Sequence, residues 1–104
     1  MSGQTHADAT DQQAYEAAIK CYVVAGNASL DRKKAGDDAK AAAYDSKAHA
    51  AFDTAVRFGR SAGLSGEQMT RDFEATQEQE LQKLVRDENY NRQSAANCRA
   101  LGLL

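Results

Sequence analysis

An alanine-rich stretch of 28 residues, from Gly36 to Gly63, most strongly limits what this chain can fold into. Between Asp37 and Ala62 it contains no proline and a single glycine, and alanine has the highest helix propensity of all residues. Its apolar side chains recur at the three- and four-residue spacing of a helix. We therefore expect one long helix over this stretch, with Asp37 or Asp38 as its N-cap.

The end of this helix carries several turn signals in a row. Gly63 can adopt the left-handed conformation that ends a helix, and Leu64 can fold back on the last helical turn, as in a Schellman motif. Ser65 and Gln68 have the spacing of a capping box for the next helix. Together these signals predict a helical hairpin between the long helix and the one that follows it.

The whole chain is expected to be all-α, a small four-helix bundle with a long central hairpin and two shorter terminal helices. We expect a single helical domain over 10–104, after a flexible N-terminal tail over 1–9. The helices are expected at 11–25, 37–62, 66–88 and 90–101. The absence of proline and of alternating runs of β-branched residues argues against strands.

Local signals set the bounds of the first expected helix. Thr10 and Gln13 have the spacing of a capping box and would begin it. Gly26 and Asn27 are typical of a helix end and would terminate it. The following segment, 28–35, contains the only basic run of the chain, and this pattern is typical of a solvated surface.

Composition predicts a thin hydrophobic core. Alanine occurs 21 times, whereas leucine, isoleucine, valine and phenylalanine together occur 15 times, about 14% of the chain. That share is below the roughly 20% under which disorder is considered, but disorder also requires a large net charge. The net charge here is only −2. We expect a folded domain that needs close alanine packing, a covalent link or a partner.

The two cysteines, Cys21 and Cys98, lie near opposite ends of the chain on the apolar faces of the expected terminal helices. Their spacing fits neither a CxxC redox motif nor a haem attachment or zinc site. Three interpretations remain: two independent buried thiols, a structural disulfide, or a reactive thiol. A disulfide closing this loop would stabilise the fold by about 4 kcal/mol, so we favour it for a thinly cored domain.

Few residues offer catalytic or metal-binding chemistry. Asp45, His49 and Asp53 share one helix face and form a weak candidate metal site, although we favour an exposed stripe of ion pairs. His49 and Met69 lie at different distances from the Gly63 turn, which argues against a haem between them. The chain has no nucleophile motif and no phosphate-binding loop. We therefore expect no catalytic residue, no cofactor and no enzymatic activity.

Charge and hydropathy limit the partners that this chain can have. Charges of both signs are mixed along it, which gives no basis for binding nucleic acid. No apolar run approaches the roughly 18 residues needed to span a membrane. We expect binding to another protein or self-association as a homodimer. The alternatives are an intracellular ligand-binding or enzymatic domain that uses His49 or a free cysteine, and a regulatory module that inhibits a partner.

Three segments are similar to segments of other proteins: AIKCYVVAG, AGDDAKAAAYDSKAHAAFDTAV and the closing CRALGL. They resemble short exported bacterial proteins that carry one cysteine in each terminal helix and have no assigned function. The resemblance implies a periplasmic or secreted protein with a Cys21–Cys98 disulfide. The first residues have neither the basic nor the apolar part of a signal peptide, so a cytoplasmic location is the alternative.

Overall fold

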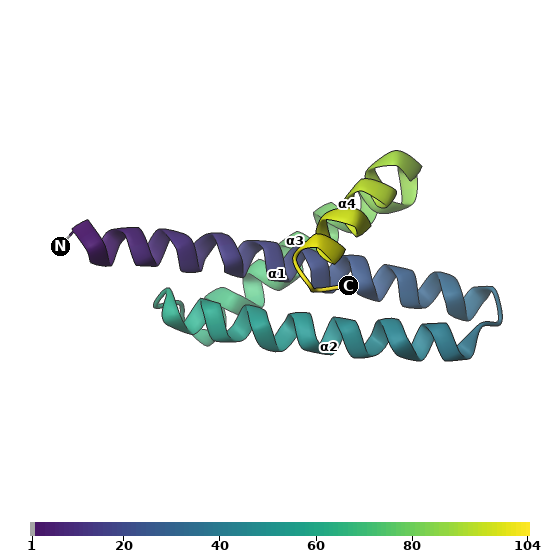
Figure 1. Cartoon of the computed structure of the whole chain (residues 1–104), viewed down its shortest axis with the longest axis horizontal. Helices are drawn as coiled ribbons and strands as arrows, with labels where there is room; N and C mark the ends of the chain where they lie inside the picture. The colour runs from purple at the N-terminus through teal and green to yellow at the C-terminus, as the bar shows by residue number, and fades with distance from the viewer. Residues whose placement is uncertain (1) are drawn as a thin grey trace.

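In the computed structural model, residues 2–104 form four α-helices and no strand: α1 (Ser2–Lys34), α2 (Asp38–Ser61), α3 (Gly66–Arg86) and α4 (Glu88–Ala100). The structure describes the backbone of residues 2–104 and the side chains of residues 10–104. The predicted all-α four-helix fold is confirmed. The helices form an elongated molecule with extents of 52 × 24 × 24 Å (Figure 1).

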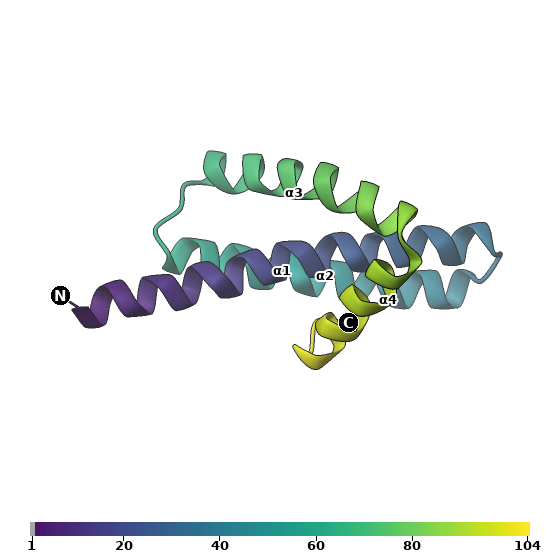
Figure 2. The ribbon, with the colours of Figure 1, turned by 90° about the horizontal axis from the view of Figure 1, so that it is seen from above.

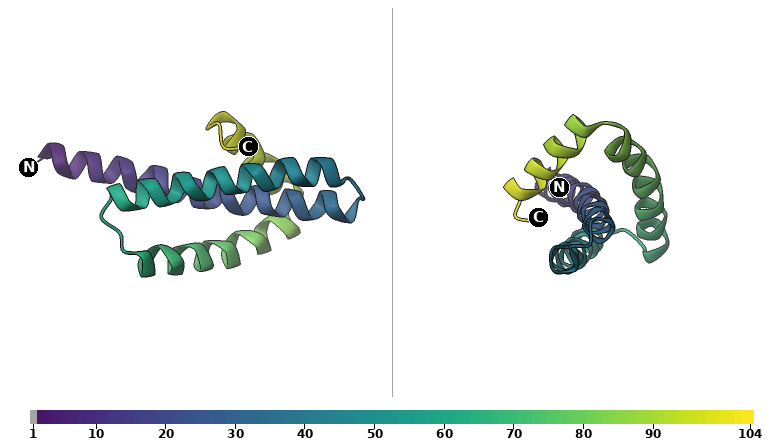
Figure 3. Two further views of the ribbon diagram at one scale, coloured as in Figure 1. Left: turned by 90° about the horizontal axis from the view of Figure 1, so that it is seen from below. Right: turned by 90° about the vertical axis from the view of Figure 1, so that its right-hand side faces the viewer.

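The helix at the centre of the fold is α1. It runs antiparallel to α2, and together they form the long hairpin (Figure 1). After the turn at Gly63, α3 packs against α1 instead of running along α2, and α4 then crosses α1 (Figure 2). An end-on view shows the other three helices on different sides of α1 (Figure 3). The predicted pairing of the long hairpin was therefore wrong, because α2 pairs with the helix before it.

The first helix is much longer than predicted because it continues through Gly26 and Asn27. Glycine inside a helix costs about 1 kcal/mol relative to alanine, which made this pair a reasonable helix end. Asn27 and Ser29 are nevertheless buried, and Ser29 Oγ donates a hydrogen bond to the carbonyl of Ala41 in α2 at 3.1 Å. Tertiary packing therefore outweighs local propensity, and the helix ends only at Lys34.

The start of α1 also differs from the predicted bounds. The helix begins at Ser2, so Thr10 and Gln13 lie inside it and do not cap it. Its first turns extend beyond the end of α2 (Figure 1). The backbone is thus helical where a tail was expected, and Met1 lies outside the described residues. The separation of a flexible tail from the domain stays a prediction.

Three helices end on the same glycine-based motif. Gly36, Gly63 and Gly102 have φ values of 79°, 84° and 74°, in the left-handed region that glycine adopts without steric cost. At Gly63, the N–H of Leu64 donates to the carbonyl of Gly59 at 2.9 Å, which is the long hydrogen bond of a Schellman motif. The predicted end of the Ala-rich helix is therefore present.

Side-chain caps begin the next helices. The predicted capping box is present, since the N–H of Gln68 donates to Ser65 Oγ at 3.2 Å and the N–H of Ser65 donates to Gln68 Oε1 at 3.0 Å. Asp37 caps α2 by accepting a hydrogen bond from the N–H of Lys40 at 3.1 Å. Asp87 alone separates α3 from α4 and caps α4. These local bonds fix where the helices begin.

The hydrophobic core has two parts, and α1 contributes to both. The part around the cysteines comprises Cys21, Val23, Val24, Ala51, Leu84 and Cys98. The part nearer the Gly63 turn comprises Tyr15, Ala18, Ile19, Ala55 and Met69. In both parts α1 supplies large side chains, whereas α2 supplies alanine, so the two helices can approach each other closely.

Candidate functional site

An open groove lies between α2 and α3, with α1 as its floor, and we call it the α2–α3 groove. Its volume is about 420 Å³. The groove exists because α3 packs on α1 and stands away from α2 (Figure 2). Its apolar lining consists of Tyr22 from α1, Phe52 and Val56 from α2, and Met69 and Phe73 from α3.

Three aromatic rings form the middle of this groove. The ring centroids of Phe52 and Phe73 are 4.9 Å apart. The centroid of the Tyr22 ring lies 5.9 Å from that of Phe52 and 5.3 Å from that of Phe73. These distances are typical of attractive aromatic pairs. Phe52 remains 41% exposed even so. The cluster is therefore packed inside the protein on one side and open to a partner on the other.

Helical spacing places the apolar residues of each groove wall in one row along their helix. Phe52 and Val56 are four residues apart on α2, and Met69 and Phe73 are four residues apart on α3. The sequence offers one sign of this role. Phe52 and Val56 lie beside the row of buried alanines on α2, not within it, and a second apolar row on one helix indicates a second contact surface.

A second hollow of about 250 Å³ continues the groove along α1 and shares Tyr22 and Gln77 with it. Two residues of the weak candidate metal site, Asp45 and His49, line this second hollow. Both His49 and Asp53 are exposed, and Asp45 is partly buried. Among the residues that the structure describes, no three His, Cys, Asp or Glu side chains are grouped so that they could hold a metal ion. None of the three residues lines the α2–α3 groove, and Asp53 lies outside the second hollow as well.

One polar contact holds the first half of α3 on α1. Tyr15 is only 1% exposed, and its hydroxyl donates a hydrogen bond to Asp72 Oδ2 at 2.7 Å. Burial, together with the hydrogen bond to the Asp72 carboxylate, raises the pKa of Tyr15 far above its ordinary value. The phenol is therefore a stable neutral donor and fixes one end of the groove floor.

A charged cluster around the buried Glu80 holds the second half of α3. The hydroxyl of Tyr90 in α4 donates to the carboxylate of Glu80, and the Nζ atoms of Lys20 and Lys83 lie 3.7 and 3.5 Å from its oxygens. Burial alone would lower the pKa of Lys20, but its contacts with Tyr90 and Glu80 outweigh burial and raise it. Sequence reasoning missed Glu80, because nothing in its local pattern distinguishes it from the exposed carboxylates around it.

The two cysteines form the covalent link between α1 and α4. Cys21 and Cys98 are disulfide-bonded, with their Cα atoms 5.6 Å apart and a sequence separation of 77. Neither cysteine is a free thiol. The structure thus contains the disulfide that we favoured from the sequence. Neither cysteine is available as the free thiol that the alternative enzymatic interpretation would use.

The residues of the capping turn have a positioning role. The end of α2 and the start of α3 are fixed by Gly63, Leu64, Ser65 and Gln68. This turn therefore helps to position Val56 and Met69, which line the groove. They do not set the separation between the two helices. That separation follows from the packing of α3 on α1.

Comparisons with known protein families, with functionally described proteins and with solved structures find no match to this chain. No enzyme family or enzyme fold therefore points to a reaction. Among the described residues, no helix is both long and apolar enough to cross a membrane. The chemistry that the site itself offers is apolar and aromatic contact, bordered by polar and charged side chains such as Arg60 and Glu74.

Proposed function

We propose that this protein acts by binding an amphipathic helix of a partner protein in the α2–α3 groove. The observation that carries the proposal is the cluster of Tyr22, Phe52 and Phe73, in which Phe52 stays 41% exposed between two helices. Aromatic side chains are the residues that most often dominate binding energy at protein interfaces. A groove between helices is a common binding site for a helical peptide.

The arrangement of the helices supports a helical occupant. α2, α1 and α3 form a curved layer, and α4 lies across α1 instead of filling the space between α2 and α3 (Figure 3). A bound helix could place apolar residues at i, i+3, i+4 and i+7 against the aromatic cluster. It would bury apolar surface in a protein whose own core is thin, which favours association.

The cellular location belongs to the same proposal. A disulfide persists in oxidising compartments and is rare in the cytosol. The Cys21–Cys98 pair and the resemblance to exported bacterial proteins both support a periplasmic or secreted protein. The partner would then be another exported protein or the exposed part of a membrane protein.

The proposal can be tested with a displayed library of peptides of about 20 residues, the length of a helix that would span the groove. We expect the selected peptides to be amphipathic helices. Phe52→Glu should weaken their binding by about tenfold or more, because it places a charge in the aromatic cluster. The matched control is Leu101→Glu, which changes another exposed large apolar residue, at the end of α4.

Two results would contradict this function. One is that no amphipathic peptide is selected, and the other is that selected peptides bind the Phe52→Glu variant as tightly as the parent protein. Sedimentation equilibrium of the protein alone identifies a further outcome. If the protein dimerises and Phe52→Glu abolishes the dimer, the occupant of the groove is a second copy of this chain.

A further inference from the structure

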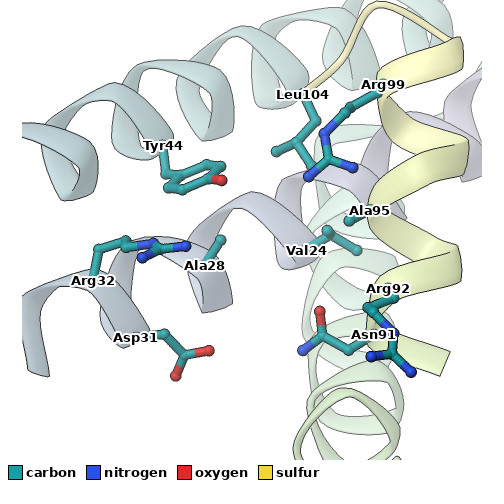
Figure 4. Close-up of a pocket in the computed structure, with 10 residues that line it drawn as sticks. All are labelled: Val24, Ala28, Asp31, Arg32, Tyr44, Asn91, Arg92, Ala95, Arg99 and Leu104. Carbon is teal, nitrogen blue, oxygen red and sulfur yellow. The ribbon is translucent and has the colours of Figure 1, made fainter. Parts of the chain in front are cut away.

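A further hollow lies between α1, α2 and α4 and shares no lining residue with the α2–α3 groove (Figure 4). Its volume is about 450 Å³. We infer that this hollow, which we call the arginine pocket, binds a small organic anion: a carboxylate or phosphate group carried on an apolar body. Its charge, its lining and its dependence on α4 each support this assignment.

The pocket gathers positive charge from two helices. Arg32 comes from the last turn of α1, and Arg92 and Arg99 come from α4. The two residues of α4 are seven apart, which places them on one helix face. Figure 4 shows Arg32 reaching in from one side and Arg99 from the other. Asp31 is the one acidic side chain in the lining, so the cations are in excess.

These guanidinium groups are not neutralised by the protein. None of the ion pairs formed among residues 10–104 involves Arg32, Arg92 or Arg99. Arg92 donates a hydrogen bond to the neutral side chain of Asn89. The whole chain carries a net charge of −2, so this local excess of positive charge contrasts with the rest of the molecule. An anion would be attracted to this local excess of positive charge.

The rest of the lining is suited to an apolar body. Val24, Ala28, Ala95 and Leu104 contribute aliphatic surface, and the ring of Tyr44 borders the same space (Figure 4). Within the described residues the Tyr44 hydroxyl makes no hydrogen bond, so it can donate one to a ligand. Apolar surface with a few converging polar groups is typical of small-molecule sites.

The chemistry of arginine defines the ligand class. A guanidinium group presents paired N–H donors that match the two oxygens of a carboxylate or phosphate. A volume of about 450 Å³ lies within the range of small-molecule pockets and is too small to enclose a helix. The expected ligand therefore has an anionic group that pairs with an arginine of the lining and an apolar part on the aliphatic surface.

The disulfide decides whether the pocket is complete. Arg99 follows Cys98 directly, and the Cys21–Cys98 bond holds α4 against α1. Two of the three arginines belong to α4, so releasing this helix would remove most of the positive charge from the site. Binding of the anion is therefore linked to the oxidised protein. By the reciprocity of linked equilibria, the bound anion should also make the disulfide harder to reduce.

The inference can be tested by titrating the ¹⁵N-labelled oxidised protein with benzoate and phenyl phosphate, using benzamide as the neutral counterpart and inorganic phosphate as the anion without an apolar body. We expect saturable shifts at Ala28, Tyr44 and Ala95 with both aromatic anions. Benzamide and inorganic phosphate should each bind about tenfold more weakly or worse, because each lacks one half of the recognition.

Matched variants assign the effect to the pocket. Arg32→Gln/Arg99→Gln should weaken benzoate binding by about tenfold or more. Arg57→Gln/Arg71→Gln removes the same charge from exposed positions on α2 and α3 and should leave binding unchanged. Cys21→Ser/Cys98→Ser should lose binding, and circular dichroism checks that its helices persist. The arginine variants test the site even if this cysteine variant unfolds.

Three results would overturn the inference: no localised shifts with either anion up to about 10 mM, equal binding of benzamide, or equal loss in both double-arginine variants. The test is separate from that of the proposed function. Phe52→Glu lies outside the pocket and should leave benzoate binding unchanged, whereas the Arg32→Gln/Arg99→Gln variant should still bind the selected peptides.

Discussion

The two long helices of this protein have opposite relations to their surroundings. α1 contacts all three other helices and buries large residues such as Tyr15, Ile19, Val23 and Val24. The buried residues of α2 are four alanines and Gly59, and α2 packs mainly on α1. The alanine-rich helix α2, which has the highest helix propensity, therefore lies at the edge of the fold. The centre is formed by α1, although its sequence contains Gly26 and Asn27.

This difference shows what decides the place of a helix in a bundle. Alanine stabilises the helix itself but buries little apolar area, whereas burial of a valine, isoleucine or leucine contributes about 1.5–3 kcal/mol. Large apolar residues occur on several sides of α1, so three helices can pack on it at once. The single small-residue face of α2 suits one close neighbour.

The largest expected effect comes from removing the disulfide, which joins α1 to α4 and has no counterpart on α2. Cys21→Ser/Cys98→Ser should lower the free energy of unfolding by about 4 kcal/mol, because the disulfide closes a long loop in the unfolded chain. Urea denaturation of the oxidised parent protein and of the variant measures this difference. A loss below about 1 kcal/mol would mean that packing alone holds α4 on α1.

The next effect compares β-branched residues of the two helices. Ile19→Ala in α1 should cost about 3 kcal/mol, since Ile19 is fully buried and its loss leaves a cavity. Val56→Ala in α2 should cost about 1 kcal/mol or less, because Val56 is only partly buried at the groove. Equal losses in the two urea titrations would contradict the central role assigned to α1.

A smaller effect distinguishes the glycines inside the two helices. A Cβ atom at Gly59 would lie 2.5 Å from Met69 Sδ and 3.0 Å from the ring of Tyr15, whereas a Cβ atom at Gly26 would meet nothing within 4 Å. Gly59→Ala should therefore destabilise the fold by about 1 kcal/mol through overpacking. Gly26→Ala should stabilise it by about 0.5–1 kcal/mol through helix propensity. Thermal unfolding of both variants should show shifts of opposite sign.

The smallest effect on stability at neutral pH is expected from the polar contacts that Tyr15 and Lys20 of α1 make with neighbouring helices. The folded protein raises the pKa of Tyr15 above its ordinary value of 10.0, and it also raises the pKa of Lys20. The folded state thus holds these protons more tightly than the unfolded state does, so stability is full below pH 10 and falls as pH rises above it. Tyr15→Phe should make the alkaline fall in unfolding free energy shallower, while Tyr22→Phe serves as the control. If the unfolding free energies of Tyr15→Phe and of the parent protein fall equally steeply with pH, the stabilising role assigned to the Tyr15–Asp72 contact is wrong.

Local structure was the part of the fold that could be predicted from sequence. The glycine at Gly63 and the capping box of Ser65 and Gln68 depend on backbone bonds between residues near in sequence, and they are present. Placing Cys21 and Cys98 on inward faces also needed only helical periodicity. Helix bounds failed at Gly26 and Asn27, because a buried neighbour compensated for poor propensity there.

The candidate sites could be predicted only in part. Helical spacing places Phe52 and Phe73 on apolar faces, but whether such a face is covered depends on where the next helix packs. Arg32 and Arg99 lie 67 positions apart in sequence, and only the crossing of α4 over α1 brings both to one pocket. The burial of Glu80 likewise depends on Lys20 and on Tyr90, from two other helices.

The sequence by itself determined that this protein is all-α, where two of its turns lie, and that its core would be thin. Propensity, capping and composition act within a few residues, so they can be evaluated along the chain. Only the tertiary structure decided that α1 is central, that α3 leaves α2 and opens a groove, and that α4 completes an arginine pocket. Those outcomes depend on which helix offers the larger apolar area to its neighbours, and that competition involves all four helices at once.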